Sequence, residues 1–179
     1  MRLGGETVEL GTAPGVFSGS RIDPGTEVLL HELPEVPKEG RFLDIGCGYG
    51  PIALTMAAAA PQAEVWAVDV NDLALELCAE NAERLGMDNV RTARPDDVPA
   101  DLRFDFIASN PAIRIGKQNL HDMLSLWLGR LAPQGDAYLV VQRHLGSDSL
   151  QRWLIEEGWS ADRYASRGGF RVLHCRHAD

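Results

Sequence analysis

An α/β fold built on a seven-stranded, mostly parallel sheet is predicted by three features of this 179-residue chain. Short β-like runs alternate with helical patterns from Arg41 onward, which is typical of parallel strands joined by crossover helices. A glycine-rich turn follows the first of these runs, at the position where such sheets bind ligands. The last two runs, at residues 159–165 and 169–175, are expected to form an antiparallel pair that closes the sheet.

The first two strands are expected at residues 41–45 and 63–69, with an apolar helix over residues 51–60 between them. Another helix should start after Asn71 and be capped by Gly86, because apolar residues recur along one helical face. These apolar residues are Ala74, Cys78, Ala82 and Leu85.

A short strand near Val90 and a strand over residues 104–109 come next. Apolar residues at the spacing of one helical face then indicate a further helix, which Pro133 and Gly135 are expected to end. Its apolar residues are Leu120, Leu124, Trp127, Leu128 and Leu131.

The strand after this helix is expected at residues 137–141, and Ser147 is expected to cap the helix that follows. That helix should bury Leu150, Trp153 and Leu154. The chain shows no internal repeat and no low-complexity segment, so residues 41–179 are interpreted as one domain.

Residues 1–40 differ from the rest because they are short of regular pattern and rich in glycine and proline. One helix is predicted there, over residues 24–33, with Asp23 as its cap and Pro24 at its first position. We interpret this segment as a flank or lid to the α/β core.

Composition and charge exclude several classes of protein. Hydrophobic residues make up 45% and charged residues 24%, as in ordinary globular proteins, and no apolar run reaches the roughly 20 residues of a membrane span. The N-terminus shows no export signal, so a cytoplasmic protein without a membrane partner is expected. The net charge of −9 argues against a broadly basic surface for nucleic acid, and leaves room for a basic patch around one site.

Cysteines and histidines predict neither disulfides nor a metal site. Cys47, Cys78 and Cys175 lie far apart without paired spacing, which fits a reducing compartment. His174, Cys175 and His177 lie on the final expected strand and lack a fourth ligand, so no metal is expected.

The turn after the first strand carries alternating glycines, in the sequence Asp44-Ile-Gly46-Cys47-Gly48-Tyr-Gly50. Glycine permits a tight turn and lets a ligand lie against bare main chain. Asp69 ends the second strand, 21 residues after Gly48, where a carboxylate can accept hydrogen bonds from both hydroxyls of a ribose. Glycines alone are also typical of a plain turn, but together with Asp69 they predict a nucleoside cofactor.

The glycine spacing favours S-adenosylmethionine over NAD. Dinucleotides are bound by G-x-G-x-x-G, whereas this chain has G-x-G-x-G with Asp44 two residues before Gly46. A carboxylate at that position repels a pyrophosphate but can pair with the ammonium group of an amino acid. Asp96, after the third strand, is either an acceptor for the adenine amino group or a solvated loop acid.

The end of the fourth strand, Ser109-Asn110-Pro111-Ala112-Ile113, is expected to face the methyl group of the cofactor. The Asn110 side-chain carbonyl and the following main-chain carbonyl can accept both hydrogens of a planar amine, which aims the nitrogen lone pair at that methyl group. Pro111 stiffens the turn. Asn-Pro alone is a common turn, and the glycine turn upstream is what favours the functional interpretation.

Basic residues in loops near the carboxyl ends of the strands form a candidate surface for RNA phosphates, if they converge. Otherwise they are scattered, solvated side chains. They are Arg21, Arg114, Lys117, Arg143 and Arg167.

Together these motifs resemble the class I S-adenosylmethionine-dependent methyltransferases with the small "MTS" domain. Within them, the chain is similar to enzymes that methylate the 2-amino group of guanine in small-subunit ribosomal RNA. The matching segments are residues 15–18, 23–26, 43–52, 68–71, 109–111 and 113–117. The resemblance implies a Rossmann-like, seven-stranded αβα sandwich. Ala112 stands where the family usually has a second proline.

The motifs and the resemblance give a set of expected site residues. Phe17 is expected either to fold over the cofactor or to plug the edge of the sheet, and Ile113 to stack on the target base. Asn110 and Pro111 are the expected catalytic residues. Cofactor contacts are expected at Phe17, Asp44, Gly46, Cys47, Gly48, Gly50, Asp69, Val70, Asp96 and Asn110, and substrate contacts at Ile113, Arg114, Lys117 and Arg143.

The predicted reaction is methyl transfer from S-adenosylmethionine to an exocyclic amino nitrogen, foremost that of guanine in ribosomal RNA or a ribosomal particle. Two alternatives are kept. One is a methyltransferase of a protein amide or a small-molecule amine, and the other is a non-catalytic module that binds the cofactor and recognises RNA.

Overall fold

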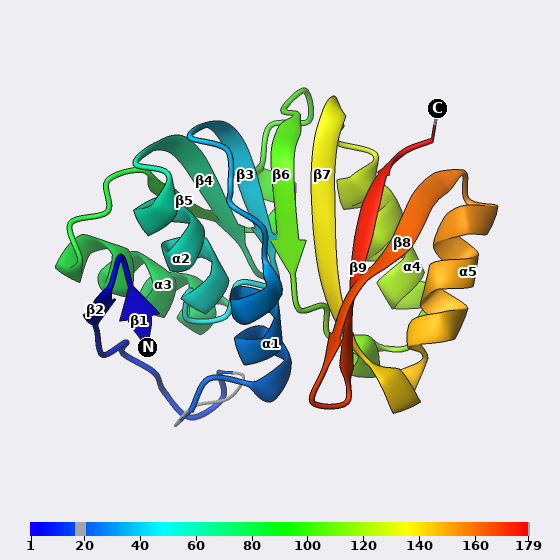
Figure 1. Ribbon diagram of the computed structural model, residues 1–179. Coiled ribbons are helices and arrows are strands. Elements are labelled where there is room, and N and C mark those ends of the chain that lie inside the picture. The colour runs from blue at the N-terminus through cyan, green and yellow to red at the C-terminus, as the bar shows by residue number, and fades with distance from the viewer. Residues whose placement is uncertain (17–20, 179) are drawn as a thin grey trace.

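A seven-stranded sheet with helices on both faces forms the body of the protein, shown by a computed structural model that describes residues 1–16 and 21–178 (Figure 1). The order of the strands across the sheet is β5-β4-β3-β6-β7-β9-β8. They are β3 (Glu39–Ile45), β4 (Gln62–Val68), β5 (Val90–Ala93), β6 (Phe104–Ser109), β7 (Leu131–Gln142), β8 (Trp159–Arg167) and β9 (Phe170–His177).

The pairing of the strands confirms the predicted fold class. Strands β3 to β7 are parallel, and β9 runs antiparallel between β7 and β8. The chain order reverses beside β3, where Ile45 pairs with Val68 of β4 on one side and with Ser109 of β6 on the other. The loops after these three strands therefore meet at one edge of the sheet, which is the place where such sheets bind ligands.

In the described residues, five helices and three short 3-10 turns connect the strands. Helices α4 and α5 cover one face of the sheet, and α1 and α2 lie on the other, with α3 beside α2 (Figure 1). The helices are α1 (Pro24–Glu32), α2 (Pro51–Ala59), α3 (Asp72–Arg84), α4 (Lys117–Leu128) and α5 (Ser147–Glu156). The 3-10 turns are Pro95–Asp97, Ile113–Ile115 and Arg143–Leu145.

Burial follows from the sequence pattern of each helix. Leu120, Leu124 and Trp127 of α4 are buried at the spacing of one helical face and pack on the sheet with Leu154 of α5. Helix α2 lies deepest, because its apolar residues are buried on nearly every side. The packing of the helices on the sheet forms two hydrophobic cores. These cores hold the sheet rigid and fix where its loops emerge.

The structure corrects two predicted helix boundaries. Helix α4 ends at Leu128, and Leu131 begins β7, where it pairs with Phe104. Strand β7 therefore starts before Pro133, the residue that was expected to end the helix. Ser147 is the first residue of α5 rather than its cap, because Gly146 occupies the cap position with a φ of 105°.

The N-terminal segment contains a small hairpin that was not predicted, made of β1 (Arg2–Leu3) and β2 (Glu6–Thr7). Helix α1 begins as expected, since Asp23 Oδ2 accepts a hydrogen bond from Thr26 N at 3.1 Å. Over residues 1–16 and 21–178, no helix is long and apolar enough to cross a membrane. The same part of the chain contains no cluster of three metal-ligating side chains, and its three cysteines are free.

Candidate functional site

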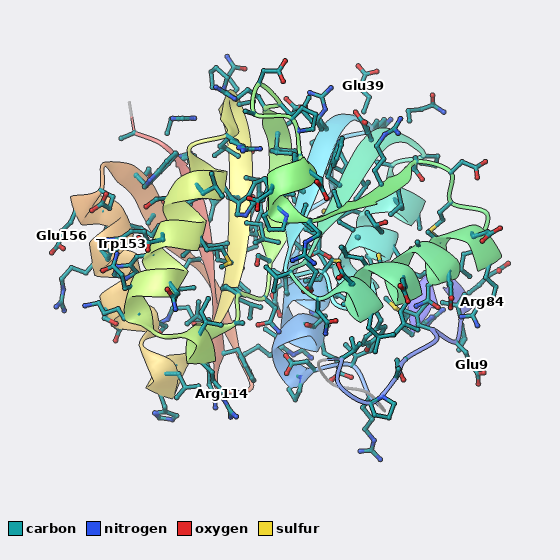
Figure 2. All side chains as sticks on the ribbon, turned by 180° about the vertical axis from the view of Figure 1, so that it is seen from behind. Glu9, Glu39, Arg84, Arg114, Trp153 and Glu156 are labelled. Atoms are coloured by element: carbon teal, nitrogen blue, oxygen red, sulfur yellow. The ribbon has the colours of Figure 1, made fainter. Side chains whose placement is uncertain are left out.

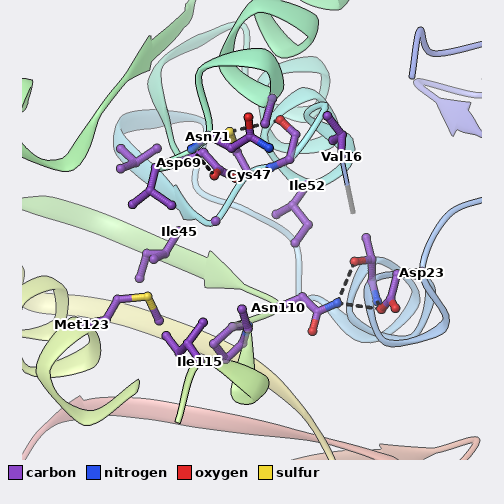
Figure 3. Close-up of a pocket in the computed structure, with 18 of the residues that line it drawn as sticks. Val16, Asp23, Ile45, Cys47, Ile52, Asp69, Asn71, Asn110, Ile115 and Met123 are labelled. Atoms are coloured by element: carbon purple, nitrogen blue, oxygen red, sulfur yellow. Dashed lines mark hydrogen bonds between the residues drawn. The ribbon is translucent and has the colours of Figure 1, made fainter. Parts of the chain in front are cut away.

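A cavity of about 820 Å³ opens at the edge of the sheet where the parallel strands end (Figure 3). The glycine turn after β3, the end of β4, the loop after β6 and the residues before α1 surround it. The predicted site residues that line it are Gly46, Cys47, Gly48, Asp69, Val70, Asn110, Pro111 and Arg114. The cavity therefore brings together the two motifs that the sequence analysis singled out.

The glycine turn presents bare main chain to this cavity. Gly46 and Gly48 have φ angles of 71° and 55°, in the left-handed region that favours glycine, and a Cβ on either would meet no atom within 4 Å. The turn is fixed from behind, because Gly46 N and Cys47 N both donate to Val68 O, at 2.8 and 3.0 Å. A ligand can thus approach a backbone whose shape is already set.

Gly50 has a different role from its two neighbours. It does not line the cavity, and a Cβ there would lie 2.8 Å from Cys78 Sγ, against α3. It also caps α2 with a φ of 103°. The structure therefore places Gly50 in the packing between the turn and α3, although a cofactor contact was predicted for it.

Asp69 lies at the end of β4, partly exposed on the cavity wall. Its Oδ2 accepts from Gly48 N and its Oδ1 accepts from Asn71 N, each at 2.9 Å. A carboxylate has about four acceptor sites, so both oxygens retain one for a ligand. Asp69 therefore shapes the glycine turn and also presents the acceptors that a ribose needs.

Asp44 departs from its predicted position. Its carboxylate is completely buried under the glycine turn, where Oδ2 accepts from Ala53 N of α2 at 2.9 Å and Oδ1 has no hydrogen-bond partner among the described residues. Burial raises the pKa of this carboxyl to about 8. Asp44 does not line the cavity, although a cofactor contact was predicted for it, and its carboxylate ties the turn to α2.

We expect Asp44 to make the stability of the protein depend on pH. In the unfolded chain this carboxyl ionises near its ordinary pKa of 3.8, but in the folded protein it keeps its proton up to about pH 8. The folded state thus binds more protons in this window, and the free energy of unfolding should fall as the pH rises from about 4 to 8.

Urea unfolding of Asp44→Asn tests this dependence. The amide keeps the acceptor for Ala53 N but cannot ionise, so its unfolding free energy should lack a slope of up to about 1.4 kcal/mol per pH unit. Asp88→Asn, on an exposed loop, should retain the wild-type slope. Equal slopes in wild type and Asp44→Asn would contradict the buried, protonated carboxyl.

Residues 9–16, which precede α1, cover the glycine turn, and we call them the roof. Asn81 of α3, which is buried, accepts from Gly11 N at 2.7 Å and donates to Gly11 O and Tyr49 O. Asn71 Nδ2 donates to Gly15 O at 3.2 Å, and Arg84 donates to Glu9 O (Figure 2). These bonds hold Gly15 and Val16 at the cavity wall. Phe17, the predicted lid residue, lies outside the described residues.

The role of Asn81 was not predicted from the sequence. Its signal was a polar residue placed within the apolar face that runs through Cys78 and Ala82 of α3. A buried amide needs partners, and here it finds them on the main chain of the roof and of the glycine turn.

Asn110 stands at the opposite wall of the cavity, just after β6. Its Nδ2 donates to Asp23 Oδ2 at 2.7 Å and to Thr26 Oγ1 at 3.0 Å, so both amide hydrogens are used (Figure 3). The side-chain carbonyl Oδ1 makes no hydrogen bond with any described residue. Neither Asp23 nor Thr26 was predicted as a site residue, although both line the cavity.

The remaining predicted residues lie at different distances from the cavity. Arg114 lines it, and Lys117, the first residue of α4, and Arg143, which begins the 3-10 turn after β7, are exposed at the end of the sheet where β6 and β7 end. Asp96 is exposed beside Pro95, which lines the cavity. For Ile113 the structure describes only the backbone, within the 3-10 turn Ile113–Ile115.

The basic residues at this end of the sheet differ in whether they form ion pairs. Arg167 pairs with Glu32 of α1 at 3.4 Å, whereas Arg114, Lys117 and Arg143 make no hydrogen bond or ion pair with a described residue. Arg21 lies exposed before α1. Gln142, at the end of β7, also lines the cavity and was not predicted. Within the described part of the chain, Arg114 and Gln142 line the cavity together with Asn110, and Lys117 and Arg143 follow the ends of β6 and β7.

A family model for the methyltransferase small domain matches residues 7–174 of the chain. The chain belongs to this family. Membership makes it an S-adenosylmethionine-dependent methyltransferase of the class I, Rossmann-like fold, as the resemblance implied. The cofactor fits the residues present, since the cavity joins bare glycine backbone and the Asp69 carboxylate at one end to Asn110 at the other.

Relatives of this methyltransferase small domain include proteins with and without a described activity. The chain is 37% identical to the uncharacterised protein YbxB of Bacillus subtilis, over 75% of this chain and 69% of that one. It is 38% identical to ribosomal RNA small subunit methyltransferase C of Hahella chejuensis, over 78% of this chain and 42% of that protein.

A solved structure extends the likeness across nearly the whole chain. The Thermus thermophilus 16S rRNA N2 G1207 methyltransferase, in complex with AdoMet and guanosine, superposes with a TM-score of 0.85 at 25% identity. The match covers 99% of this chain and 49% of that one. The chain thus spans less than half the length of the ribosomal RNA methyltransferases that it resembles.

Proposed function

We propose that this methyltransferase acts on the exocyclic amino group of guanine in ribosomal RNA. The observation that supports this most directly is the orientation of Asn110, whose amide hydrogens are bound to Asp23 and Thr26 and whose Oδ1 is left to accept. The main-chain carbonyl of Pro111, the next residue, likewise makes no hydrogen bond with a described residue. Two adjacent acceptors match the two hydrogens of a planar amine.

The chemistry follows from how these acceptors hold the amine. When bound, S-adenosylmethionine would supply a methyl group on a positively charged sulfur, which can leave with the carbon–sulfur electron pair when an amine nitrogen attacks that methyl group. Asn110 Oδ1 and Pro111 O fix both amine hydrogens, so the nitrogen lone pair faces the methyl group. They also stabilise the positive charge that reaches the nitrogen. The surplus proton then leaves to water.

RNA as the substrate is supported by the surroundings of Asn110 and by the relatives. Arg114, Lys117 and Arg143 offer unpaired positive charge on a chain whose net charge is −9. Two relatives that share this domain are named as ribosomal RNA methyltransferases. A protein amide or a small-molecule amine would satisfy Asn110 equally well but gives no reason for these cations.

Transfer of radioactive methyl groups tests the substrate class. Purified protein and tritiated S-adenosylmethionine are incubated with total RNA, total protein and metabolites from a strain that lacks the protein. We expect label in ribosomal RNA that digests to a methylated guanosine. Label confined to the protein or metabolite pool would overturn the RNA assignment, and cofactor binding with no transfer to any pool would favour the non-catalytic module.

The free cations make a separate prediction about RNA affinity. Replacing Lys117 and Arg143 together with alanine should weaken binding of ribosomal RNA and lower the slope of log K against log salt by about 0.7–0.9 for each phosphate that the variant no longer neutralises. Arg103→Ala, at the opposite end of the sheet before β6, is the matched control. A salt slope that equals that of the control would show that these cations do not contact phosphate.

A further inference from the structure

We propose that Asp23 is a positioning residue, whose carboxylate sets the amide of Asn110 in the orientation that methyl transfer requires. This inference rests on the proposed function, because it concerns how the amine acceptor of that reaction is held. Asp23 lies in the segment before α1, 87 positions from Asn110 in the sequence, and the fold brings the two side chains together over a 2.7 Å hydrogen bond.

The two ends of an asparagine amide are nearly alike in shape but opposite in hydrogen bonding. Its oxygen and nitrogen differ little in size, so a half-turn of the amide exchanges an acceptor for a pair of donors. Donors turned to the cavity would meet the hydrogens of a target amine and repel them. The reaction therefore needs a partner that accepts only one of the two orientations.

Asp23 is such a partner, and Thr26 is not. A carboxylate only accepts hydrogen bonds, so it requires the NH₂ of Asn110 on its side and would repel Oδ1. The Thr26 hydroxyl accepts at 3.0 Å in the structure, but it can also donate and would tolerate either orientation. Asp23 thus selects the orientation, and Thr26 strengthens it.

The position of Asp23 is itself fixed by α1. Its Oδ2 accepts from Thr26 N at 3.1 Å as the cap of the helix, and the same oxygen accepts from Asn110 Nδ2. Thr26 is buried, and Phe170 of β9 lies close to Gly25 in the first turn of α1. One carboxylate oxygen therefore joins the start of α1 to the loop after β6 (Figure 3).

Four variants separate positioning from helix capping. Asp23→Ala removes both hydrogen bonds, whereas Asp23→Asn keeps one oxygen, which the cap hydrogen bond from Thr26 N should hold in place as the acceptor for Asn110. Thr26→Val removes only the hydroxyl acceptor and leaves the cap intact, with Thr26→Ser as its matched control. Thermal melting of each variant identifies the loss of stability that a missing cap produces.

The first measurement reads the orientation of Asn110 without any substrate. In ¹⁵N-labelled protein, the Asn110 side-chain NH₂ signals are the pair that is absent in Asn110→Ala. We expect these signals to shift and to exchange faster with water in Asp23→Ala, and to stay near their wild-type positions in Asp23→Asn. Unchanged Asn110 signals in Asp23→Ala would overturn the proposal.

The second measurement is a double-mutant cycle on methyl transfer to total ribosomal RNA. Asp23→Ala should lower kcat by about 10–100-fold and leave the Kd for S-adenosylmethionine within about twofold, and Asp23→Asn should restore most of the rate. In the Asn110→Ala background, Asp23→Ala should have no further effect beyond about twofold. An additive loss, as a purely structural cap would give, would overturn the proposal.

The two measurements also separate this inference from the function on which it rests. If the wild-type protein transfers no methyl group to RNA, the proposed substrate fails, while the NH₂ signals of Asn110 still decide whether Asp23 orients it. If RNA is methylated and the Asn110 signals are unchanged in Asp23→Ala, the proposed function stands and the positioning role fails.

Discussion

Replacing Asn110 with alanine should reduce the rate of methyl transfer by roughly 10²–10³-fold, the range for removing one preorganised polar group at a reacting centre. The side-chain oxygen is expected to accept from the target amine only in the ternary complex, so the loss should appear in kcat. The Kd for S-adenosylmethionine, measured by calorimetry, should stay near its wild-type value. This division between rate and affinity identifies a residue that acts on the amine.

Two further variants are needed to interpret this result. Gln134→Ala removes an exposed amide at the far end of β7 and should leave the rate unchanged. Asn110→Asp keeps an acceptor but places a second carboxylate against Asp23, where the amide now donates at 2.7 Å, so it should also be slow. Near wild-type turnover by Asn110→Ala would show that this loop does not hold the amine.

Replacing Asp69 with alanine should weaken binding of S-adenosylmethionine by about 1–3 kcal/mol, the range for charge-assisted hydrogen bonds. The variant loses the acceptors for the ribose. It also releases Gly48 N and Asn71 N, which the carboxylate now holds at 2.9 Å, so part of the loss comes from a looser glycine turn. Isothermal calorimetry measures the change directly.

The control for Asp69→Ala is a variant that loses the same charge at a position away from the cavity. Asp88→Ala removes an exposed carboxylate on the loop before β5 and should bind the cofactor as the wild type does. Equal Kd values for wild type and Asp69→Ala would mean that the ribose is bound elsewhere. Loss of affinity in both variants would instead indicate a general effect of net charge.

The sequence predicted the fold because each strand and helix carries its own local pattern. Leu131 shows where such patterns mislead. It continues the apolar spacing of Leu128 and Trp127, yet it begins β7, because the backbone pairing with Phe104 outweighs a helical position that local spacing alone favours. Pairing with a distant strand is not visible in a local window of sequence.

The position of a site residue could be predicted where the main chain alone determines it. The direction of its side chain was harder to predict. Asp69 follows β4 and Asn110 follows β6, the two parallel strands on either side of β3, so their meeting at one cavity follows from topology. Asp44 also ends a strand, but its carboxylate turns under the glycine turn to the first turn of α2. Asp23 and Asn81 lie outside these strand ends, and their contacts with Asn110 and Gly11 form only in the folded chain.

The roof over the glycine turn has a consequence for the entropy of binding. Because Asn81 and Asn71 already fix the backbone at Gly11 and Gly15, that half of the cavity needs little further ordering when a ligand enters. Arg114, Lys117 and Arg143 make no hydrogen bond or ion pair with a described residue, and immobilising each long side chain costs about 0.5–1.5 kcal/mol. We therefore expect the entropic penalty of forming the ternary complex to fall mainly on the step that binds RNA.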